Sequence, residues 1–385
     1  MAPHFNPIQQ VVDMYTETDN RAPLDHGGSP ADCGQQFFER TCDIINAGAQ
    51  AVMISIGHRS GLFDTMARLD PATSQQIADQ AGLAERFVRE WLATMVTAGI
   101  IDYSAERRSY RLPPAHAACL TRGAELGNAA VFAQHVAMMG ALQDQTLHCL
   151  ESGAGTRYSD YPCFHQVMAE DSELSVVDSL TNTILPMIDG IDARLRAGID
   201  VLDAGCGKGL ALVTMAAHYP QSRFTGYDLC ADAIADASHL AASRGLQNLR
   251  FVARDLTDLD EPEGYDFITS FDAVHDQKHP AQLVANIQRA LKPAGIYLMQ
   301  DIGGSAHLEN NLDFPMASLL YAISITHCTP VSIGQGGEGL GAMWGWETAQ
   351  TMLEQAGFTT VERHLLEHDP MNVWFVSRKE QFHVS

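Results

Sequence analysis

The chain has 385 residues, of which 46 % are hydrophobic and 18 % are charged. This composition is typical of a folded globular protein, and a chain of this length usually forms two domains. Acidic residues outnumber basic ones by 47 to 24, which gives a formal net charge of −23. Because nucleic-acid affinity comes largely from Lys and Arg that neutralise phosphates, this charge argues against DNA, RNA or an anionic membrane as a partner. It favours a small neutral or cationic partner.

The sequence offers no sign of export or membrane insertion. The N-terminus lacks a basic start followed by an apolar run, and no stretch of about 18 apolar residues occurs. The eight cysteines are scattered and none forms a C-x-x-C pair, which favours reduced thiols over disulfides or a structural zinc site. We therefore expect a cytoplasmic protein that holds no metal.

Residues 34–111 have the pattern of a winged helix-turn-helix. Apolar residues at helical spacing are followed by a short helix that ends at Gly82 and a second that ends at Gly99. Two short strand patterns then flank the polar turn 104–109, which completes the order helix, turn, helix, hairpin. The expected recognition helix carries two Glu and two Arg within 85–90 and no basic stripe. This favours a packing and dimerisation module over a DNA reader.

From Gly198 onward, strand and helix patterns alternate, which predicts an α/β fold with a parallel sheet covered by helices on both faces. The last two of the seven strand patterns lie too close together for a crossover helix, so one of them must run antiparallel. We expect three regions, a winged-helix domain at 1–122, a helical connector at 123–197 and the α/β domain at 198–385. The segment 302–345 has no strand pattern, and we interpret it as a cap inserted over the active site.

A glycine-rich turn follows the first strand of the α/β domain. Asp203 leads the pattern D-x-G-x-G-x-G, in which Gly205, Gly207 and Gly209 precede a helix. Glycines are needed where the backbone turns sharply and approaches a ligand closely. The spacing differs from the dinucleotide pattern G-x-G-x-x-G, and the leading acid would repel a pyrophosphate. It suits the ammonium group of S-adenosylmethionine.

Two further acids occupy matching positions after the next two strands. Asp228 ends FTGYD and can accept hydrogen bonds from both ribose hydroxyls, while Asp255 follows FVAR and is placed to contact the adenine amino group. The alternative is a glycine-rich turn with two helix-capping aspartates, but three acids in register are rarely found by chance. The remaining residues predicted to line the cofactor site are Leu229, Leu256 and Phe271.

Residues 201–378 resemble the class I S-adenosylmethionine-dependent methyltransferase domain, through the segments VLDAGCGKG, GYDL and ARDL. The whole chain resembles the two-domain bacterial methyltransferases that act on small molecules, in which SIGHRSGLFD, FDAVHDQKHP and GLGAMWG are characteristic. The resemblance implies a Rossmann-like seven-stranded sheet with an antiparallel last strand, S-adenosylmethionine as cofactor, and a winged-helix domain that builds a homodimer. It leaves the acceptor atom open among oxygen, sulfur and nitrogen.

His275 and Asp276 are the catalytic candidates, because they follow the fourth strand at the edge where the methyl group would point. An acceptor O–H or S–H must lose a proton, and histidine, with an ordinary pKa of about 6.5, suits that task. The resemblance to plant-type O-methyltransferases supports His275 as the general base, since their base lies in L-H-D-W and this chain has V-H-D-Q. The alternative is a histidine packed at the strand end beside a helix-capping Asp276.

Three other side chains are candidates for contact with the acceptor. His58 ends an apolar helix, where it either reaches the acceptor or is a satisfied helix-terminal histidine. His327 and Trp344 lie in the glycine-rich insertion, which we interpret as a lid over the acceptor or as an exposed loop.

The predicted reaction is direct methyl transfer to an O, S or N atom of a small molecule. Two alternatives stay open, an S-adenosylmethionine-sensing winged-helix regulator and a class I fold used for a reaction other than methylation.

Overall fold

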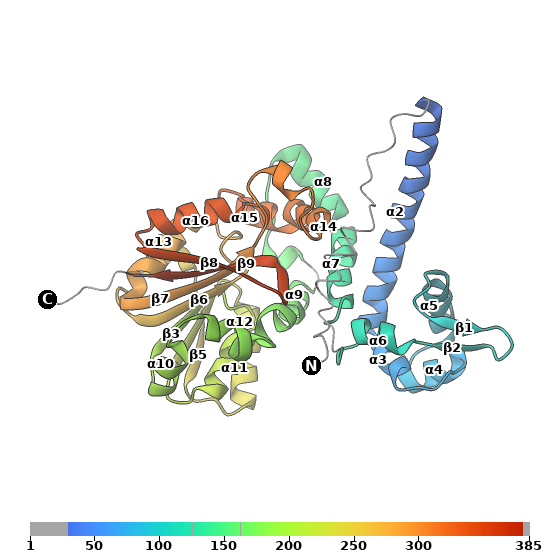
Figure 1. The fold of residues 1–385 in the computed structure, drawn as a ribbon, viewed down its shortest axis with the longest axis horizontal. Helices are drawn as coiled ribbons and strands as arrows, with labels where there is room; N and C mark the ends of the chain where they lie inside the picture. Colours follow the sequence, from blue (N-terminus) through green and yellow to red (C-terminus); the bar gives the residue numbers. More distant parts are fainter. Residues whose placement is uncertain (1–29, 125–126, 162, 380–385) are drawn as a thin grey trace, which may run out of the picture. The chain divides into compact units, whose positions relative to one another are not determined.

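The computed structural model describes residues 30–124, 127–161 and 163–379 of the chain (Figure 1). The chain divides into two compact units, Met1–Gly140 and Ala141–Ser385. Across the described residues, no helix combines the length and the apolar character needed to cross a bilayer.

The first unit is a set of helices that ends in a small hairpin. Gly61, with φ +72°, interrupts the helical stretch before Ser74, and Gly82, with φ +67°, ends the next helix. Phe63, Ile77 and Leu92 are fully buried in the core of this unit. The elements of the unit are α2 (Pro30–Arg59), α3 (Leu62–Ala67), α4 (Ser74–Ala81), α5 (Glu85–Thr97), β1 (Asp102–Ser104), β2 (Ser109–Arg111), α6 (Pro114–Leu120) and α7 (Ala130–Ala141), the last of which ends one residue beyond it. This order matches the expected winged helix-turn-helix.

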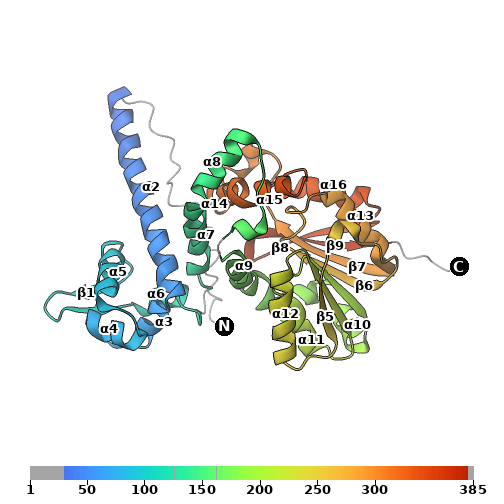
Figure 2. The same cartoon turned by 180° about the vertical axis from the view of Figure 1, so that it is seen from behind.

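The second unit is built on a seven-stranded sheet with the order β5-β4-β3-β6-β7-β9-β8 (Figure 2). Only β9 runs antiparallel to its neighbours, so the expected antiparallel strand lies inside the sheet between β7 and β8. All seven expected strands are present, at β3 (Asp200–Ala204), β4 (Arg223–Asp228), β5 (Leu249–Ala253), β6 (Tyr265–Phe271), β7 (Leu291–Ile302), β8 (Thr360–Leu366) and β9 (Asp369–Arg378).

Helices cover both faces of this sheet and bury its side chains in two apolar clusters. Tyr297 and Met299 of β7 pack into the cluster with α13 and α16, whereas the intervening Leu298 packs into the cluster with α10 and α11. This alternation follows from the two-residue period of a strand. The helices are α10 (Ile191–Ala197), α11 (Leu210–His218), α12 (Ala231–Ser243), α13 (Pro280–Ala290) and α16 (Trp346–Gln355).

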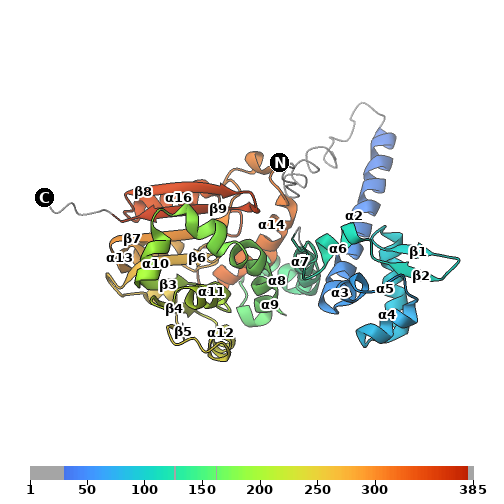
Figure 3. The same ribbon diagram turned by 60° about the horizontal axis from the view of Figure 1, so that its bottom comes forward.

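Two further segments of the second unit, 143–187 and the insertion 302–345, are helical and lie side by side (Figure 3). The Thr156 N–H donates to the Pro330 carbonyl at 2.8 Å, and a Cβ on Gly334 would fall 1.9 Å from the Thr156 carbonyl oxygen. Gly334 is therefore needed for close backbone packing. The elements are α8 (Gln143–Ser152), η1 (Tyr158–Asp160), α9 (Phe164–Ser172), η2 (Glu173–Val177), η3 (Leu180–Ile184), η4 (Leu185–Met187), η6 (Leu308–Asn311), α14 (Ala317–Ile323), η7 (Ser324–Cys328) and α15 (Thr329–Gly334).

Candidate functional site

The glycine-rich turn lies at the carboxyl end of β3. Gly205, Gly207 and Gly209 all have positive φ angles, of +87°, +50° and +70°. A Cβ on Gly205 would lie 2.6 Å from the Cβ of Ala273, whereas a Cβ on Gly207 would meet no atom within 4 Å. The turn is thus closed against the protein at Gly205 and open at Gly207, where backbone is accessible to a ligand.

Asp228 joins this turn to the end of β4. Its two carboxylate oxygens accept hydrogen bonds from the N–H groups of Gly207, at 2.9 Å, and Cys230, at 2.8 Å. Each oxygen still has a lone pair that can accept a hydroxyl. The next residue, Leu229, is 46 % exposed and presents an apolar surface beside these acceptors. A carboxylate next to an exposed leucine can hold a sugar and an adjoining planar base.

Asp255 and its neighbours already make contacts with other residues of the chain. The Asp255 carboxylate caps the turn that follows β5 by accepting from the Thr257 N–H at 2.9 Å, and it pairs with Lys278 at 2.6 Å. Burial would raise the pKa of Asp255, but these two partners lower it. Leu256 is buried, and Phe271 packs against a tryptophan of β9. Asp255 makes the capping contacts of the alternative interpretation, and its contact with adenine stays a prediction.

Asp203 is enclosed between β3 and β6. It is 2 % exposed and accepts a hydrogen bond from the Thr269 hydroxyl at 2.8 Å. Burial raises the pKa of this carboxyl to about 7. A cation bound nearby would favour its ionised form.

The chemical groups around the turn fit S-adenosylmethionine better than a dinucleotide. A pyrophosphate needs backbone N–H groups at a helix terminus or free cations. The two lysines near the turn are already paired, Lys208 with Asp236 at 2.9 Å and Lys278 with Asp255. Carboxylates, open glycine backbone and an apolar side chain remain, which suit an ammonium group, a ribose and an adenine.

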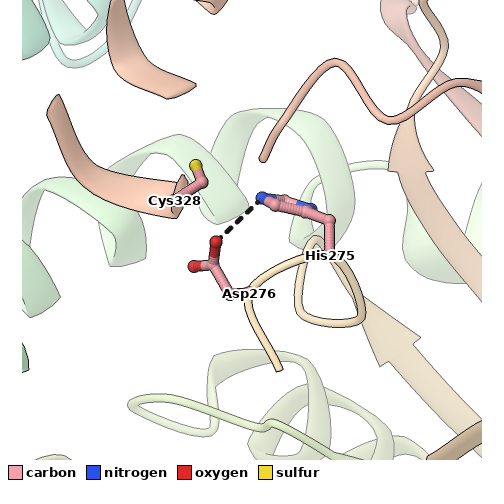
Figure 4. Close-up of side chains that lie close together, drawn as sticks. All are labelled: His275, Asp276 and Cys328. Carbon is pink, nitrogen blue, oxygen red and sulfur yellow. Dashed lines mark ion pairs between the residues drawn. The ribbon is translucent and has the colours of Figure 1, made fainter. Parts of the chain in front are cut away.

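His275 lies in the loop after β6 and is 3 % exposed. Its Nδ1 atom is 2.8 Å from Oδ1 of Asp301, a buried residue near the end of β7. The same oxygen accepts from the indole N–H of Trp344 at 3.0 Å. On the opposite side of the ring, Nε2 faces the Asp276 carboxylate at 3.2 Å (Figure 4).

These carboxylates and the imidazole shift one another's pKa values. Burial would lower the pKa of His275, but Asp301 and Asp276 outweigh it and hold that pKa well above its usual range. Burial would likewise raise the pKa of Asp276, but His275 lowers it strongly. Asp272 lies farther from the ring, with Oδ1 3.8 Å from Nδ1, and burial outweighs the attraction of His275 and raises the pKa of Asp272 to about 8. The two carboxylates therefore favour the protonated form of His275 over the neutral ring.

His327 reaches the same group from η7 of the insertion. Its Nε2 atom is 3.4 Å from Oδ2 of Asp276, and its ring packs on Phe164 and Tyr161 with centroid distances of 4.1 and 4.5 Å. Cys328 follows directly and is buried. The structure therefore brings His275, Asp276, His327 and Trp344 together, as residues of one site.

His58 lies in the first unit, where it is 2 % exposed near the end of α2. Its Nδ1 atom is 3.3 Å from the side-chain nitrogen of Asn128, and its carbonyl accepts from Arg122 at 2.9 Å. These are the contacts of a satisfied helix-terminal histidine. Contact between His58 and an acceptor stays a prediction.

Sequence reasoning missed Asp301 and Asp272, which flank His275. The signal for Asp301 was available, because it follows the fifth strand pattern in the same way that Asp228 follows the second. Asp272 has φ +52° in the turn after β6, and no pattern in the sequence identifies that conformation.

Comparison with known protein families identifies one domain in each of two parts of the chain. Residues 48–122 match the family model of the Rv2258c-like winged helix-turn-helix domain, and residues 195–357 match that of a methyltransferase domain. A methyltransferase of Aspergillus campestris, ungE′, is 34 % identical over 107 residues, which cover 26 % of this chain and 30 % of that protein. The chain spans less than a third of the length of the first curated relatives it matches.

Solved structures of other proteins have the same fold along nearly the whole length of this chain. An O-methyltransferase of Nostoc punctiforme aligns with a TM-score of 0.67 at 20 % identity, covering 91 % of this chain and 99 % of that one. Human N-acetylserotonin methyltransferase, solved with S-adenosylmethionine, aligns with a TM-score of 0.67 at 16 % identity, covering 92 % and 100 %. The chain therefore has a winged helix-turn-helix domain followed by a methyltransferase domain of the class I S-adenosylmethionine-dependent fold.

Proposed function

We propose that this chain transfers the methyl group of S-adenosylmethionine to a hydroxyl oxygen of a small molecule, with His275 as general base. The observation that carries the proposal is the buried pair of His275 and Asp301, which lies on the same sheet edge as the open glycine turn. Oxygen is favoured over sulfur and nitrogen because the fold is shared with an O-methyltransferase at a TM-score of 0.67.

The cofactor is held by groups of the chain that are already in place. Backbone at Gly207 and the free lone pairs of Asp228 would hold the amino acid and ribose portions, and Leu229 would provide an apolar surface for the adenine. Asp203 balances the positive charge from beneath the turn. S-adenosylmethionine, when bound, supplies a methyl group on a sulfonium sulfur, and alignment of the acceptor with it provides most of the rate enhancement.

His275 removes the acceptor's proton. In the neutral ring, Asp301 accepts the Nδ1–H, which leaves the lone pair on Nε2 to take the hydroxyl proton. After transfer, Asp301 and Asp276 stabilise the imidazolium that has formed.

The regulator alternative is disfavoured by the charges of the first unit. On α5, the expected recognition helix, Arg86 pairs with Glu90 and Arg89 pairs with Glu85 at 3.0 Å. Arginines neutralised in this way contribute little to phosphate binding. We infer a small-molecule acceptor and no nucleic-acid partner.

The test is an S-adenosylhomocysteine release assay with panels of phenols, alcohols, thiols, carboxylic acids and amines. We expect turnover with a hydroxyl compound, and His275→Ala should lose about 10²-fold or more of it while still binding S-adenosylmethionine by calorimetry. The matched control is His239→Ala, at an exposed position on α12. Unchanged turnover in His275→Ala would remove that residue from the mechanism. Release with thiols or amines alone would overturn the oxygen assignment, and cofactor binding without any release would favour a reaction other than methylation.

A further inference from the structure

The buried group around Asp276 contains more metal-ligand atoms than its hydrogen bonds use. His275, Asp276 and Cys328 each direct one ligand atom into the same space, and these atoms lie within 4.8 Å of one another (Figure 4). His327 adds an imidazole on the other oxygen of Asp276, at 3.4 Å. Two histidines, one carboxylate and one thiol form a donor set that zinc accepts.

Several of these atoms lack a hydrogen bond within the described part of the chain. Both ring nitrogens of His327 and Oδ1 of Asp276 are buried without one. Nε2 of His275 lies 3.2 Å from that oxygen, close enough for charge attraction but without hydrogen-bond alignment. Buried polar atoms are normally satisfied, so a cluster of unsatisfied ones marks a place where a ligand or ion belongs. His327 is 3 % exposed, and its Nε2 atom is directed at Asp276.

Hydrogen bonding around His275 selects the side of the ring on which an ion would bind. Nδ1 is already engaged, because it lies 2.8 Å from Oδ1 of Asp301. The same oxygen also accepts a hydrogen bond from the Trp344 indole. A carboxylate that accepts the second ring N–H is the usual support of a metal-bound histidine, since it fixes the tautomer and the ring orientation. Nε2, on the side of Asp276 and Cys328, is therefore the ligand atom.

The spacing of the ligand atoms is compatible with a four-coordinate ion. Bond lengths of about 2.0–2.3 Å to zinc place neighbouring ligand atoms about 3.3–3.8 Å apart in a tetrahedron. The 3.2 Å separation of His275 Nε2 from Oδ1 of Asp276 is already close to that range, whereas His327 lies 3.4 Å from the other oxygen, Oδ2. The ligand atoms of His275, Asp276 and Cys328 lie within 4.8 Å of one another, and His327 would have to rotate towards them to complete a four-coordinate site.

We propose that His275, Asp276, His327 and Cys328 bind one thiophilic divalent cation of the Zn²⁺ class, and that this cation blocks proton transfer at Nε2 of His275. The lone pair that would bind the metal is the one that would take the acceptor's proton, so the two uses exclude each other. Zinc bound at this site would therefore inhibit the protein by occupying Nε2 of its general base. The inhibitory part rests on the proposed function, whereas the binding part does not.

Cobalt substitution tests binding without any acceptor. The full chain, treated with a chelator and desalted, is titrated with Co²⁺ while the near-ultraviolet thiolate-to-cobalt band and the visible d–d bands are recorded. We expect saturation at one Co²⁺ per chain and displacement of the bands by Zn²⁺. Cys328→Ser should lose the thiolate band, and the matched control Cys42→Ser, an exposed cysteine of α2, should keep it.

Two more variants test the site without changing Cys328. Asp301→Asn removes only the support of His275, so it should keep the thiolate band and weaken binding by about 10–100-fold. His327→Gln should alter the d–d bands without removing the thiolate band. The absence of a thiolate band in the wild type, or an unchanged band in Cys328→Ser, would overturn the site.

The activity arm separates this proposal from the proposed function. Zn²⁺ should inhibit S-adenosylhomocysteine release by the wild type at the concentrations that displace cobalt. Stimulation of release by Zn²⁺ would overturn the inhibitory part and leave methyl transfer intact. If no acceptor supports release, the cobalt spectra still decide whether the metal binds.

Discussion

The Nδ1 atom of His275 lies 2.8 Å from Oδ1 of Asp301, and this oxygen also accepts hydrogen bonds from the Trp344 indole and the Ile302 N–H. Three donors on one oxygen hold the carboxylate in a single orientation. When the ring is neutral, its proton is consequently held on Nδ1 and its lone pair lies on Nε2. This relationship decides which atom of the histidine can act on an acceptor.

Asp301→Asn should lower kcat by about 10²–10⁴-fold with little change in KM, because an amide can donate to Nδ1 and so favours the wrong tautomer. The measurement is the steady-state rate of S-adenosylhomocysteine release. Trp344→Phe is the matched control, since it removes one of the three donors and keeps the carboxylate, and it should lose less than about tenfold. A wild-type kcat in Asp301→Asn would show that the pair is only structural.

Turnover should rise with pH through a range above the ordinary histidine pKa of about 6.5. The pKa of His275 is held well above that value by Asp301 and Asp276, so the neutral ring that can accept a proton becomes common only at higher pH. Replacing Asp276 with Asn removes one of these charges and should shift the rising limb of kcat/KM towards lower pH. The measurement is a pH–rate profile with an acceptor that does not itself titrate. A limb that stays in place would exclude His275 as the titrating group.

The sheet could be predicted from the sequence because strand and helix patterns alternate from β3 to α13, and because the last two strand patterns lie too close together for a crossover helix. His275 could be predicted because it stands directly after one of these strand patterns. By the same rule Asp301 could have been placed at this sheet edge, but its pairing with His275 and the approach of His327 could not be predicted. Asp301 comes from a different strand, and His327 comes from an insertion without a strand pattern. Their approach to His275 depends on packing across the sheet edge, which no local pattern encodes.

Gly207→Ala should weaken S-adenosylmethionine binding by tenfold or more, because its Cβ would project into the open space where the cofactor is expected. The positive φ of +50° adds a folding cost of about 1–2 kcal/mol. Gly245→Ala is the matched control, since its φ is +68° and its Cβ also meets no atom within 4 Å. Both variants should lose similar stability in urea unfolding, and only Gly207→Ala should lose affinity in calorimetry. Equal affinities in the two variants would move the cofactor away from this turn.

Asp203→Asn should stabilise the cofactor-free protein at pH 8 and change it little at pH 4. Burial raises the folded pKa of Asp203 to about 7 from an ordinary value near 3.8. The folded state thus holds a proton that the unfolded state releases, and the stability present below pH 4 is lost as the pH rises through 7. The asparagine avoids that loss, with a gain of up to about 4 kcal/mol at pH 8.

The opposite sign is expected for Asp200→Asn, which provides the control. Hydrogen bonds from Arg223 and Lys292 outweigh burial and lower the pKa of Asp200, so its ionised form stabilises the fold at pH 8. Urea unfolding of both variants at pH 4 and pH 8 measures the difference. A loss of stability in Asp203→Asn at pH 8 would show that the buried carboxylate has a partner that compensates its charge.

The helix α2 should pair with a second copy of the chain. Phe37, Phe38, Ile44 and Ile45 are each more than half exposed, and the two pairs are seven residues apart along the helix. Apolar side chains that repeat at this interval form one stripe, which is the pattern of helices that pack together in pairs. Exposed apolar stripes of this kind mark interaction surfaces in soluble proteins. We therefore expect a homodimer built through α2.

Ile45→Glu should shift the chain from dimer to monomer in sedimentation equilibrium, because it places a charge in the middle of the stripe. Asn46→Glu introduces the same charge on a face of α2 directed away from the stripe, and it should leave the dimer intact. Thermal unfolding of the second unit should be equal in the two variants, since Ile45 is 67 % exposed and contributes little to the core. A monomeric wild type, or a dimer that persists in Ile45→Glu, would show that α2 is not the contact.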